Sequence, residues 1–99
     1  MHVTLAWDIT ATGDRWSQIN TALKGVLKGY SWVRPLRTVY IVKVSSSEER
    51  QQLKDALIAV VESVSEKVHF IITPPMEGGK YTGWLPRDLW DKINQRTKP

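Results

Sequence analysis

The order in which hydrophobic periodicity changes along the chain most constrains its fold. Residues 2–9 alternate strictly between two faces, which is typical of a half-buried strand. The apolar face of this segment consists of Val3, Leu5, Trp7 and Ile9. Apolar residues then recur at helical spacing from Trp16 to Leu27, and again from Leu53 to Val64. Short β-branched segments lie between and after these two helical stretches and favour strands.

The breaks between these segments set the predicted boundaries. The predicted strands are residues 2–9, 30–33, 38–44 and 68–73. Asp14 is placed to cap the first helix, and Gly29 suits its end. Ser46 and Glu49 match a capping box that opens the second helix. Residues 34–36 are predicted as a turn, because the central proline cannot donate to a strand ladder.

A third helix is predicted near the end of the chain. Pro86 suits its first turn, and its apolar residues are Leu89, Trp90 and Ile93. The whole order is therefore β-α-β-β-α-β followed by a C-terminal extension. This order predicts an α+β, ferredoxin-like fold with two helices on one face of a four-stranded antiparallel sheet.

The length of 99 residues predicts one domain over 1–99, with a core at about 2–73 and an extension over 74–99. The opposite face of the sheet must then be solvated, or be covered by the extension or by a second subunit. Fold alone does not decide function, because ferredoxin-like folds host many activities.

Composition excludes several classes of site. The chain has no cysteine, which excludes disulfides, iron–sulfur clusters, thiolate zinc sites and cysteine nucleophiles. No apolar run approaches the length of about 20 residues that a membrane-spanning helix needs. The first residues also lack the charged start and apolar block of a signal peptide. We therefore expect a cytoplasmic protein without a membrane partner.

The positive charge is concentrated in the first half of the chain. The net charge is +4, and no acidic residue occurs between Asp14 and Glu48. The cations in this interval are Arg15, Lys24, Lys28, Arg34, Arg37 and Lys43. Residues 48–67 are net acidic. This separation is compatible with a polar field that meets phosphates, and equally with a plain solvated surface.

Asp8 is the most informative candidate for chemistry. It lies near the end of the first predicted strand, on the face opposite Trp7 and Ile9. A carboxylate there could bind Mg²⁺ together with waters and substrate phosphates. The alternative is an aspartate that caps the amides of Thr10 or Thr12. His69 alternates onto the same open face, as a metal ligand or general base, or as an ordinary solvated histidine.

Five tryptophans are a high number for this length. Tyr30 and Trp32 are predicted to share one strand face with Arg34, and such a row could stack on nucleic-acid bases. Aromatic anchors are equally favoured at protein interfaces. We prefer an interface, namely that of a dimer, for Trp84 and Trp90, because the extension has little core of its own.

Two short motifs in this order resemble a known superfamily. They are Trp7–Asp8–Ile9 at the end of the first strand and Leu36–Arg37–Thr38–Val39–Tyr40 at the start of the third. They resemble the small CRISPR-associated adaptation subunits ("Cas-two") and their VapD-like and SinR-like relatives. The SinR-like branch is the most similar, because its members often combine such a strand with a C-terminal helix containing tryptophan. The resemblance covers roughly residues 3–73 as topology.

The resemblance implies a ferredoxin-like homodimer whose sheets face each other. Asp8 matches the first-strand carboxylate that some members are thought to use for Mg²⁺-dependent phosphodiester cleavage. Other members are non-catalytic scaffolds for double-stranded DNA. This chain departs from the pattern in three places: Arg15 stands without a richer basic cluster, Pro35 precedes the third strand, and the extension is helical.

Two functions follow from these observations. The first is a dimeric nucleic-acid or protein adaptor without turnover, with Tyr30, Trp32, Arg34 and Arg37 as contacts. The alternative is a metal-dependent endonuclease for RNA or DNA in which paired Asp8 side chains hold Mg²⁺. In that case Arg15, Arg34 or Arg37 would neutralise the phosphate. No cofactor other than Mg²⁺ is implied, and the binding function is the preferred one.

Overall fold

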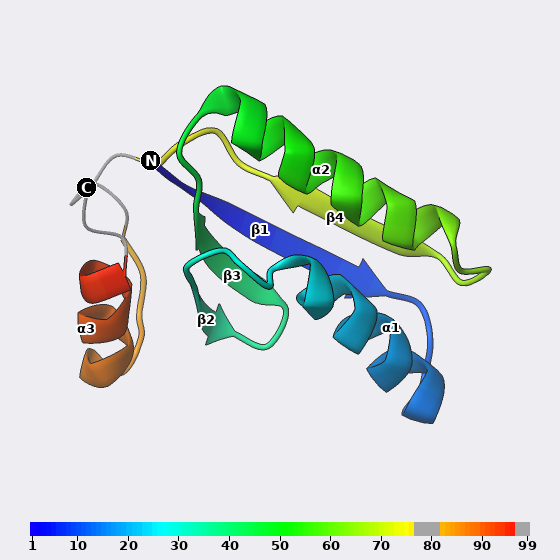
Figure 1. Cartoon of the computed structure of the whole chain (residues 1–99). Helices are drawn as coiled ribbons and strands as arrows, with labels where there is room; N and C mark the ends of the chain where they lie inside the picture. The colour runs from blue at the N-terminus through cyan, green and yellow to red at the C-terminus, as the bar shows by residue number, and fades with distance from the viewer. Residues whose placement is uncertain (77–81, 97–99) are drawn as a thin grey trace.

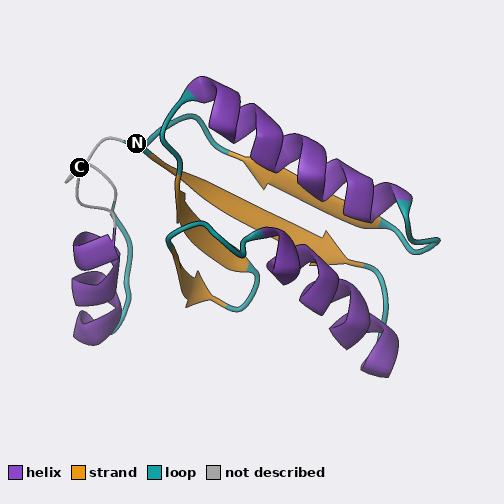
Figure 2. Cartoon of the chain, viewed as in Figure 1, coloured by secondary structure: helices purple, strands orange, loops and turns teal. Residues whose placement is uncertain are grey.

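The computed structural model describes residues 1–76 and 82–96 of the chain. The strands are β1 (His2–Ile9), β2 (Trp32–Leu36), β3 (Val39–Lys43) and β4 (Val68–Ile72). The helices are α1 (Gly13–Val26), α2 (Ser47–Glu62) and α3 (Arg87–Arg96). Their order along the chain is β1-α1-β2-β3-α2-β4-α3 (Figures 1 and 2).

The four strands form one antiparallel sheet in the order β2-β3-β1-β4. The eight-residue β1 is the central element, because it pairs with β3 on one side and β4 on the other. Helices α1 and α2 lie side by side over one face (Figure 1). This is the predicted ferredoxin-like, α+β arrangement, which the structure confirms.

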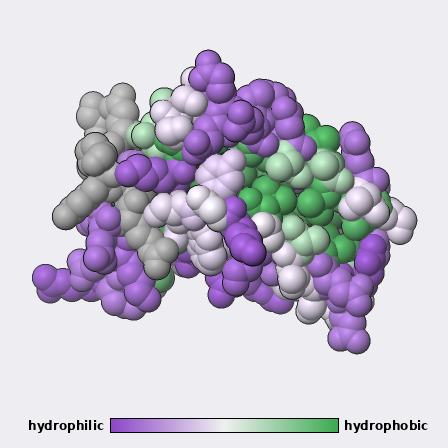
Figure 3. All heavy atoms as spheres, viewed as in Figure 1, coloured by the Kyte–Doolittle hydropathy of each residue, from purple (hydrophilic) through white to green (hydrophobic). Residues whose placement is uncertain are grey.

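The main core lies between the sheet and these two helices. Its fully buried side chains include Val3, Leu5, Leu23, Leu27, Tyr40, Val42, Leu53 and Leu57. Partly buried Val60, Val61 and Val64 of α2 and the residues after it pack against this core. Figure 3 shows the hydrophobic side chains that reach the surface between the two helices. The strict alternation of β1 therefore marks the side of the sheet that the helices cover.

A cluster of three aromatic rings lies in this core. The ring of Tyr40 stacks on that of Trp7 with centroids 4.7 Å apart, and it meets Trp32 edge-on at 5.3 Å. The indole nitrogen of Trp7 donates a hydrogen bond to Oδ1 of Asn20 in α1, at 3.0 Å. Such aromatic pairs contribute about 0.5–1.5 kcal/mol beyond their buried area. The cluster ties β1, β2, β3 and α1 together.

The C-terminal extension covers part of the opposite face. Ile93 of α3 is fully buried against Val33 of β2 and Ile41 of β3. Met76, Leu85 and Trp90 complete this smaller cluster. The prediction of a last helix with an apolar stripe is therefore confirmed, and the extension is one of the expected covers of the open face.

The starts of the first two helices differ. At α2 the Ser46 hydroxyl accepts a hydrogen bond from the Glu49 amide at 3.1 Å, which confirms the predicted cap. The Glu49 carboxylate accepts from the amide and hydroxyl of Ser45, at 3.2 and 2.8 Å. The predicted cap at Asp14 is wrong, because α1 begins at Gly13 and Thr12 is its N-cap. Asp14 lies instead in the first turn, where its negative charge stabilises the helix by interacting with the positive end of the helix dipole.

The boundaries of the second strand were also predicted wrongly. Instead of residues 30–33 followed by a turn, β2 begins at Trp32 and continues through Pro35 to Leu36. Proline is tolerated because β2 is an edge strand, and its register with β3 shifts between Val33 and Leu36. The turn follows at Arg37 and Thr38.

The helices of the described residues have 14, 16 and 10 residues. A helix needs about 20 predominantly apolar residues to cross a bilayer. Within residues 1–76 and 82–96, no helix has the length and apolarity for such a span.

Candidate nucleic-acid interface and open sheet face

Asp8 and His69 lie opposite each other on the open face of the sheet. Asp8 is exposed one residue before the end of β1, and His69 is its register partner in β4. The amide of Thr10 donates to the carbonyl of Lys67, and the amide of Thr73 donates to the carbonyl of Thr4. Hydrogen-bonded pairs recur at every second residue of an antiparallel ladder, so Asp8 and His69 also form a hydrogen-bonded pair. A shallow groove beside them is also lined by Ala6 and Ile71. The predicted placement of both side chains on this face is confirmed.

One chain supplies little of a metal site here. Nowhere in the described ranges do three His, Cys, Asp or Glu side chains gather closely enough to hold a metal ion. Mg²⁺ prefers near-octahedral oxygen ligands, and imidazole is a poor partner for it. Asp8 could hold Mg²⁺ only with waters, substrate phosphates or a second carboxylate from another copy.

The alternative role of Asp8 as a cap of the Thr10 amide is contradicted. The Thr10 amide donates to the carbonyl of Lys67 at 2.9 Å and continues the β1–β4 ladder. The loop that follows β1 is therefore held by the sheet rather than by the Asp8 carboxylate. Asp8 remains an exposed carboxylate at the end of the groove.

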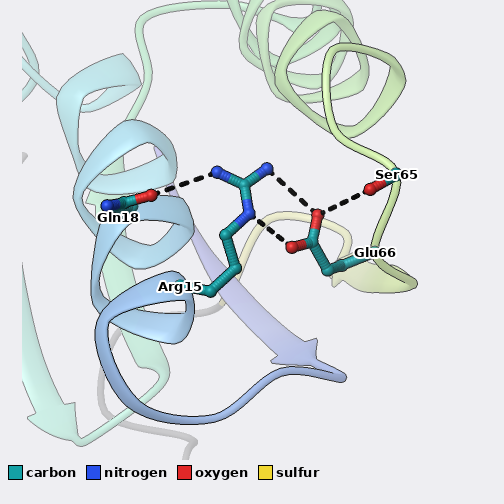
Figure 4. A network of polar contacts seen from close by, with 4 residues as sticks. All are labelled: Arg15, Gln18, Ser65 and Glu66. Atoms are coloured by element: carbon teal, nitrogen blue, oxygen red, sulfur yellow. Dashed lines mark hydrogen bonds and ion pairs between the residues drawn. The ribbon is translucent and has the colours of Figure 1, made fainter.

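Arg15 is engaged within the chain (Figure 4). Its Nε and Nη2 donate to the two carboxylate oxygens of Glu66, the second at 3.0 Å, and its Nη1 donates to Oε1 of Gln18 at 3.2 Å. The hydroxyl of Ser65 also donates to Glu66, at 3.2 Å. The hydrogen bond from Arg15 lowers the pKa of Glu66 to about 2, and the same bond raises the pKa of Arg15. A phosphate at Arg15 would have to compete with this bidentate pair.

Two other cations lie over indole rings along the contact between α1 and β2. The guanidinium of Arg37, in the β2–β3 turn, is 4.5 Å from the ring centroid of Trp16. The ammonium of Lys24, near the end of α1, is 5.4 Å from the ring of Trp32. Cation–π contacts of this kind hold a cation in place while leaving its charge near water. We call this surface, with Arg34 added, the α1–β2 seam.

Arg34 lies on β2, between Trp32 and Arg37 in the sequence. It is exposed and lines a groove with Trp32, Val33 and two residues of α3. Lys24, Arg34 and Arg37 form no ion pair with any other residue that the structure describes. These three cations are therefore available to an external anion in a way that Arg15 is not.

The predicted row of Tyr30, Trp32 and Arg34 on one strand face does not form. Tyr30 precedes β2, and its half-buried ring packs against the main core. Burial raises the pKa of Tyr30, and the charge of Glu49 raises it further. Trp32 is also half-buried, with its ring against Tyr40. Stacking on these rings by nucleic-acid bases stays a prediction, and Arg34 is the one exposed member of the set.

The two tryptophans of the extension have different environments. The Trp84 residue is 97% exposed, whereas Trp90 is half-buried in the smaller cluster beside Gly83. Together they line an apolar groove on the open face that also contains Leu36 and Val39. Trp90 therefore serves the packing of its own chain, and Trp84 remains a candidate for an interface.

Lys24 and Trp16 were not predicted from the sequence to belong to this surface. The signal that could have found them is the interval without acidic residues between Asp14 and Glu48, which contains nearly all of α1 and the whole edge strand β2. Leu36 and Ile71 were also missed as exposed apolar residues of the open face, at 56% and 65% exposure.

No protein-family model matches the sequence, and no curated protein matches it. The fold is similar to the crystal structure of a hypothetical protein from Methanocaldococcus jannascii. That match has a TM-score of 0.54 and 15% sequence identity, and it covers 95% of this chain and 94% of the other. A likeness at this identity establishes the fold and nothing about activity.

Proposed function

We propose that this protein is a small homodimeric nucleic-acid-binding module that acts as an adaptor without turnover, related to the Cas-two-like and SinR-like proteins. The observation that carries the proposal is the α1–β2 seam. Its cations Lys24 and Arg37 are held over indole rings, and Arg34 is exposed on β2. Positioned Lys and Arg side chains are the groups that bind a phosphate backbone.

The dimensions of the seam fit this use. Trp16 and Lys24 are eight residues apart on α1, which is about 12 Å along a helix axis. That length corresponds to roughly three to four nucleotide steps along one strand of a duplex. The cations at the two ends, together with the exposed Arg34 on β2, could therefore contact several phosphates of the same strand.

The rest of the charge supports one orientation of binding. Acidic residues are instead concentrated on α2 and in the turn after it, and these are Glu48, Glu49, Asp55, Glu62 and Glu66. A polyanion is therefore attracted more strongly to the seam than to α2, which is net acidic as a whole. The modest net charge of +4 therefore understates the positive potential near β2.

The dimer is proposed through the open face of the sheet. Leu36, Ile71 and Trp84 leave large apolar side chains in water there, and the Asp8 groove lies among them. Contiguous exposed apolar surface on a small protein is typical of an interaction site. A second copy placed face to face would cover these side chains, as the resemblance implies.

The binding proposal is tested by fluorescence anisotropy of labelled single- and double-stranded RNA and DNA. We expect binding by the wild type that Arg34→Ala and Arg37→Ala each weaken severalfold, since each removes one phosphate contact. The matched control is Lys67→Ala, which removes one exposed positive charge just before β4. Asp8→Asn is expected to bind as well as the wild type.

Equal weakening by Lys67→Ala would mean that net charge, and not the seam, determines affinity. Binding that is insensitive to salt between roughly 50 and 200 mM would contradict phosphate contacts altogether. Light scattering on the same samples reports the oligomer, which is expected to be a dimer.

A second candidate function is a metal-dependent endonuclease, which is favoured by the exposure of Asp8 at the end of an open groove. Two such carboxylates across a dimer could hold Mg²⁺, and the metal would activate water for phosphodiester hydrolysis. Labelled RNA and DNA are incubated with Mg²⁺, Mn²⁺ or EDTA. Metal-dependent cleavage that is lost in Asp8→Asn would establish this function, and intact substrate in every lane would rule it out for these substrates.

A further inference from the structure

The outer edge of β4 exposes backbone groups that nothing in the sheet uses. The amide of Thr73 donates to Thr4 and the carbonyl of Lys67 accepts from Thr10, so odd-numbered residues of this segment face β1. In an antiparallel ladder, the backbone amide and carbonyl of successive residues point alternately toward the neighbouring strand and away from it. The amides and carbonyls of Val68, Phe70 and Ile72 therefore point away from the sheet.

Arg50 closes one end of this edge. Its Nη2 donates to the carbonyl of Ile72 and its Nε to that of Thr73, both at 3.1 Å. The Thr73 hydroxyl takes the place of its carbonyl as acceptor for the amide of Thr4, at 2.9 Å. Pairing with a further strand is thus centred on Phe70, with Val68 and the amide of Ile72 on either side.

The two edges of the sheet are protected to different degrees. On β2, Pro35 and a register shift interrupt the ladder, and α3 packs against the strand. These are devices that natural proteins use to prevent strand addition. The segment Val68–Ile72 contains no proline and has an unbroken register with β1. It is apolar except for His69.

A groove runs along the same edge under α2. Arg50, Lys54 and Ile58 follow one another at intervals of four on α2 and form its wall, and Phe70, Ile71 and Ile72 line the strand side. Two copies of this chain paired edge to edge about Phe70 would bring their Lys54 side chains toward each other, and like charges would oppose that arrangement. An extended segment with acidic side chains has the complementary charge.

We propose that the outer edge of β4 binds an extended segment of a protein partner, which adds a fifth strand to the sheet. Alternate side chains of that segment would be acidic toward Lys54 and apolar toward the exposed Ile71. Main-chain hydrogen bonds to Phe70 supply affinity in this mode, and the alternating side chains supply specificity. The site is at the opposite edge from the α1–β2 seam, so it is independent of nucleic-acid binding.

The probe is an acetylated and amidated eight-residue peptide of alternating valine and glutamate, titrated into the isotopically labelled full-length protein. We expect saturable shifts of the backbone amides of Val68, Phe70 and Ile72, and slower hydrogen exchange at these three amides. Two further peptides have the same sequence, each with every second amide N-methylated, so that each lacks the hydrogen-bond donors of one of its two edges. One of the two is expected to bind at least about tenfold more weakly than the unmodified peptide, since each lost hydrogen bond weakens binding.

Charge specificity is tested with Lys54→Glu, for which we expect severalfold weaker binding of the valine–glutamate peptide and stronger binding of a valine–lysine peptide. Lys28→Glu, which makes the same charge change at an exposed position just after α1, should leave both affinities unchanged. No shift at millimolar peptide, shifts at β2, or equal binding of all N-methylated forms would overturn the proposal. Protection of the same amides by self-association without peptide would overturn it in favour of a second copy.

Discussion

The two faces of the sheet differ in how completely they are covered. On one face, α1 and α2 bury the odd-numbered residues of β1 together with Tyr40 and Val42. On the other face, α3 covers only the part around Val33 and Ile41, and the surface beside Asp8 stays open. The covered face determines stability, whereas the open face carries side chains that the isolated fold does not need.

The largest expected difference is between Leu57 and Ile71. Leu57 of α2 is fully buried, so Leu57→Ala should lower the free energy of unfolding by about 2–5 kcal/mol. The residue Ile71 is 65% exposed, and Ile71→Ala should change it by less than about 0.5 kcal/mol. Urea unfolding followed by tryptophan fluorescence measures both. Similar losses for the two variants would contradict the division between the faces.

Ile93 sharpens the comparison, because it is a fully buried residue of the partly covered face. Ile93→Ala should lower the free energy of unfolding by about 2 kcal/mol, the low end for such a change, since a small cluster relaxes easily. Hydrogen exchange should accelerate in α3 while the amides of β1 stay protected. Equal acceleration in both elements would show that α3 belongs to the main cooperative unit.

Tyr40 tests how an unpaired buried hydroxyl affects the stability of the main core. Its side chain is fully buried, and its hydroxyl has no hydrogen-bond partner among the residues that the structure describes. Tyr40→Phe keeps both ring contacts and removes a buried unpaired group, so it should raise stability by up to about 1 kcal/mol. Thermal unfolding measures the change. A clear loss of stability would reveal a partner for the hydroxyl.

The smallest expected effect on stability is that of Glu66, at the margin of the covered face. Its pKa falls from 4.5 to about 2 through the hydrogen bond from Arg15, so the pair stabilises the fold above pH 4.5 and less as the pH falls toward 2. Glu66→Gln should lower the melting temperature slightly at pH 7, and this difference should shrink between pH 4.5 and 2. Glu62→Gln is the matched control, and an identical pH profile for both variants would contradict the account.

Periodicity was sufficient to predict most of the fold. The alternation of β1 gave its bounds and its buried face, and the helical stripes gave both covering helices. Pro35 led to a wrong boundary, because whether proline interrupts a strand depends on whether that strand is central or at an edge. The local pattern around Pro35 carries no information about edge position, which only the order of the whole sheet supplies.

The candidate site was predictable only where one strand determines it. Alternation placed Asp8 and His69 on the open face without any tertiary information. The contact of Arg37 with Trp16 depends on how α1 lies along β2, and Arg15 meets Glu66 across 51 positions of sequence. Local pattern carries no signal for such pairs, so the sequence predicted Arg15 and Arg37 as equivalent contacts although one is paired and the other is not.

The most direct test of the proposed function is the salt dependence of duplex DNA binding by the wild type and by the Arg34→Ala/Arg37→Ala double variant. Each phosphate contact contributes a slope of about 0.9 to the dependence of log affinity on log salt concentration. The account predicts that the double variant loses about two contacts and a slope of about 1.8. An unchanged slope, or no binding by the wild type at low salt, would contradict the α1–β2 seam as a nucleic-acid interface.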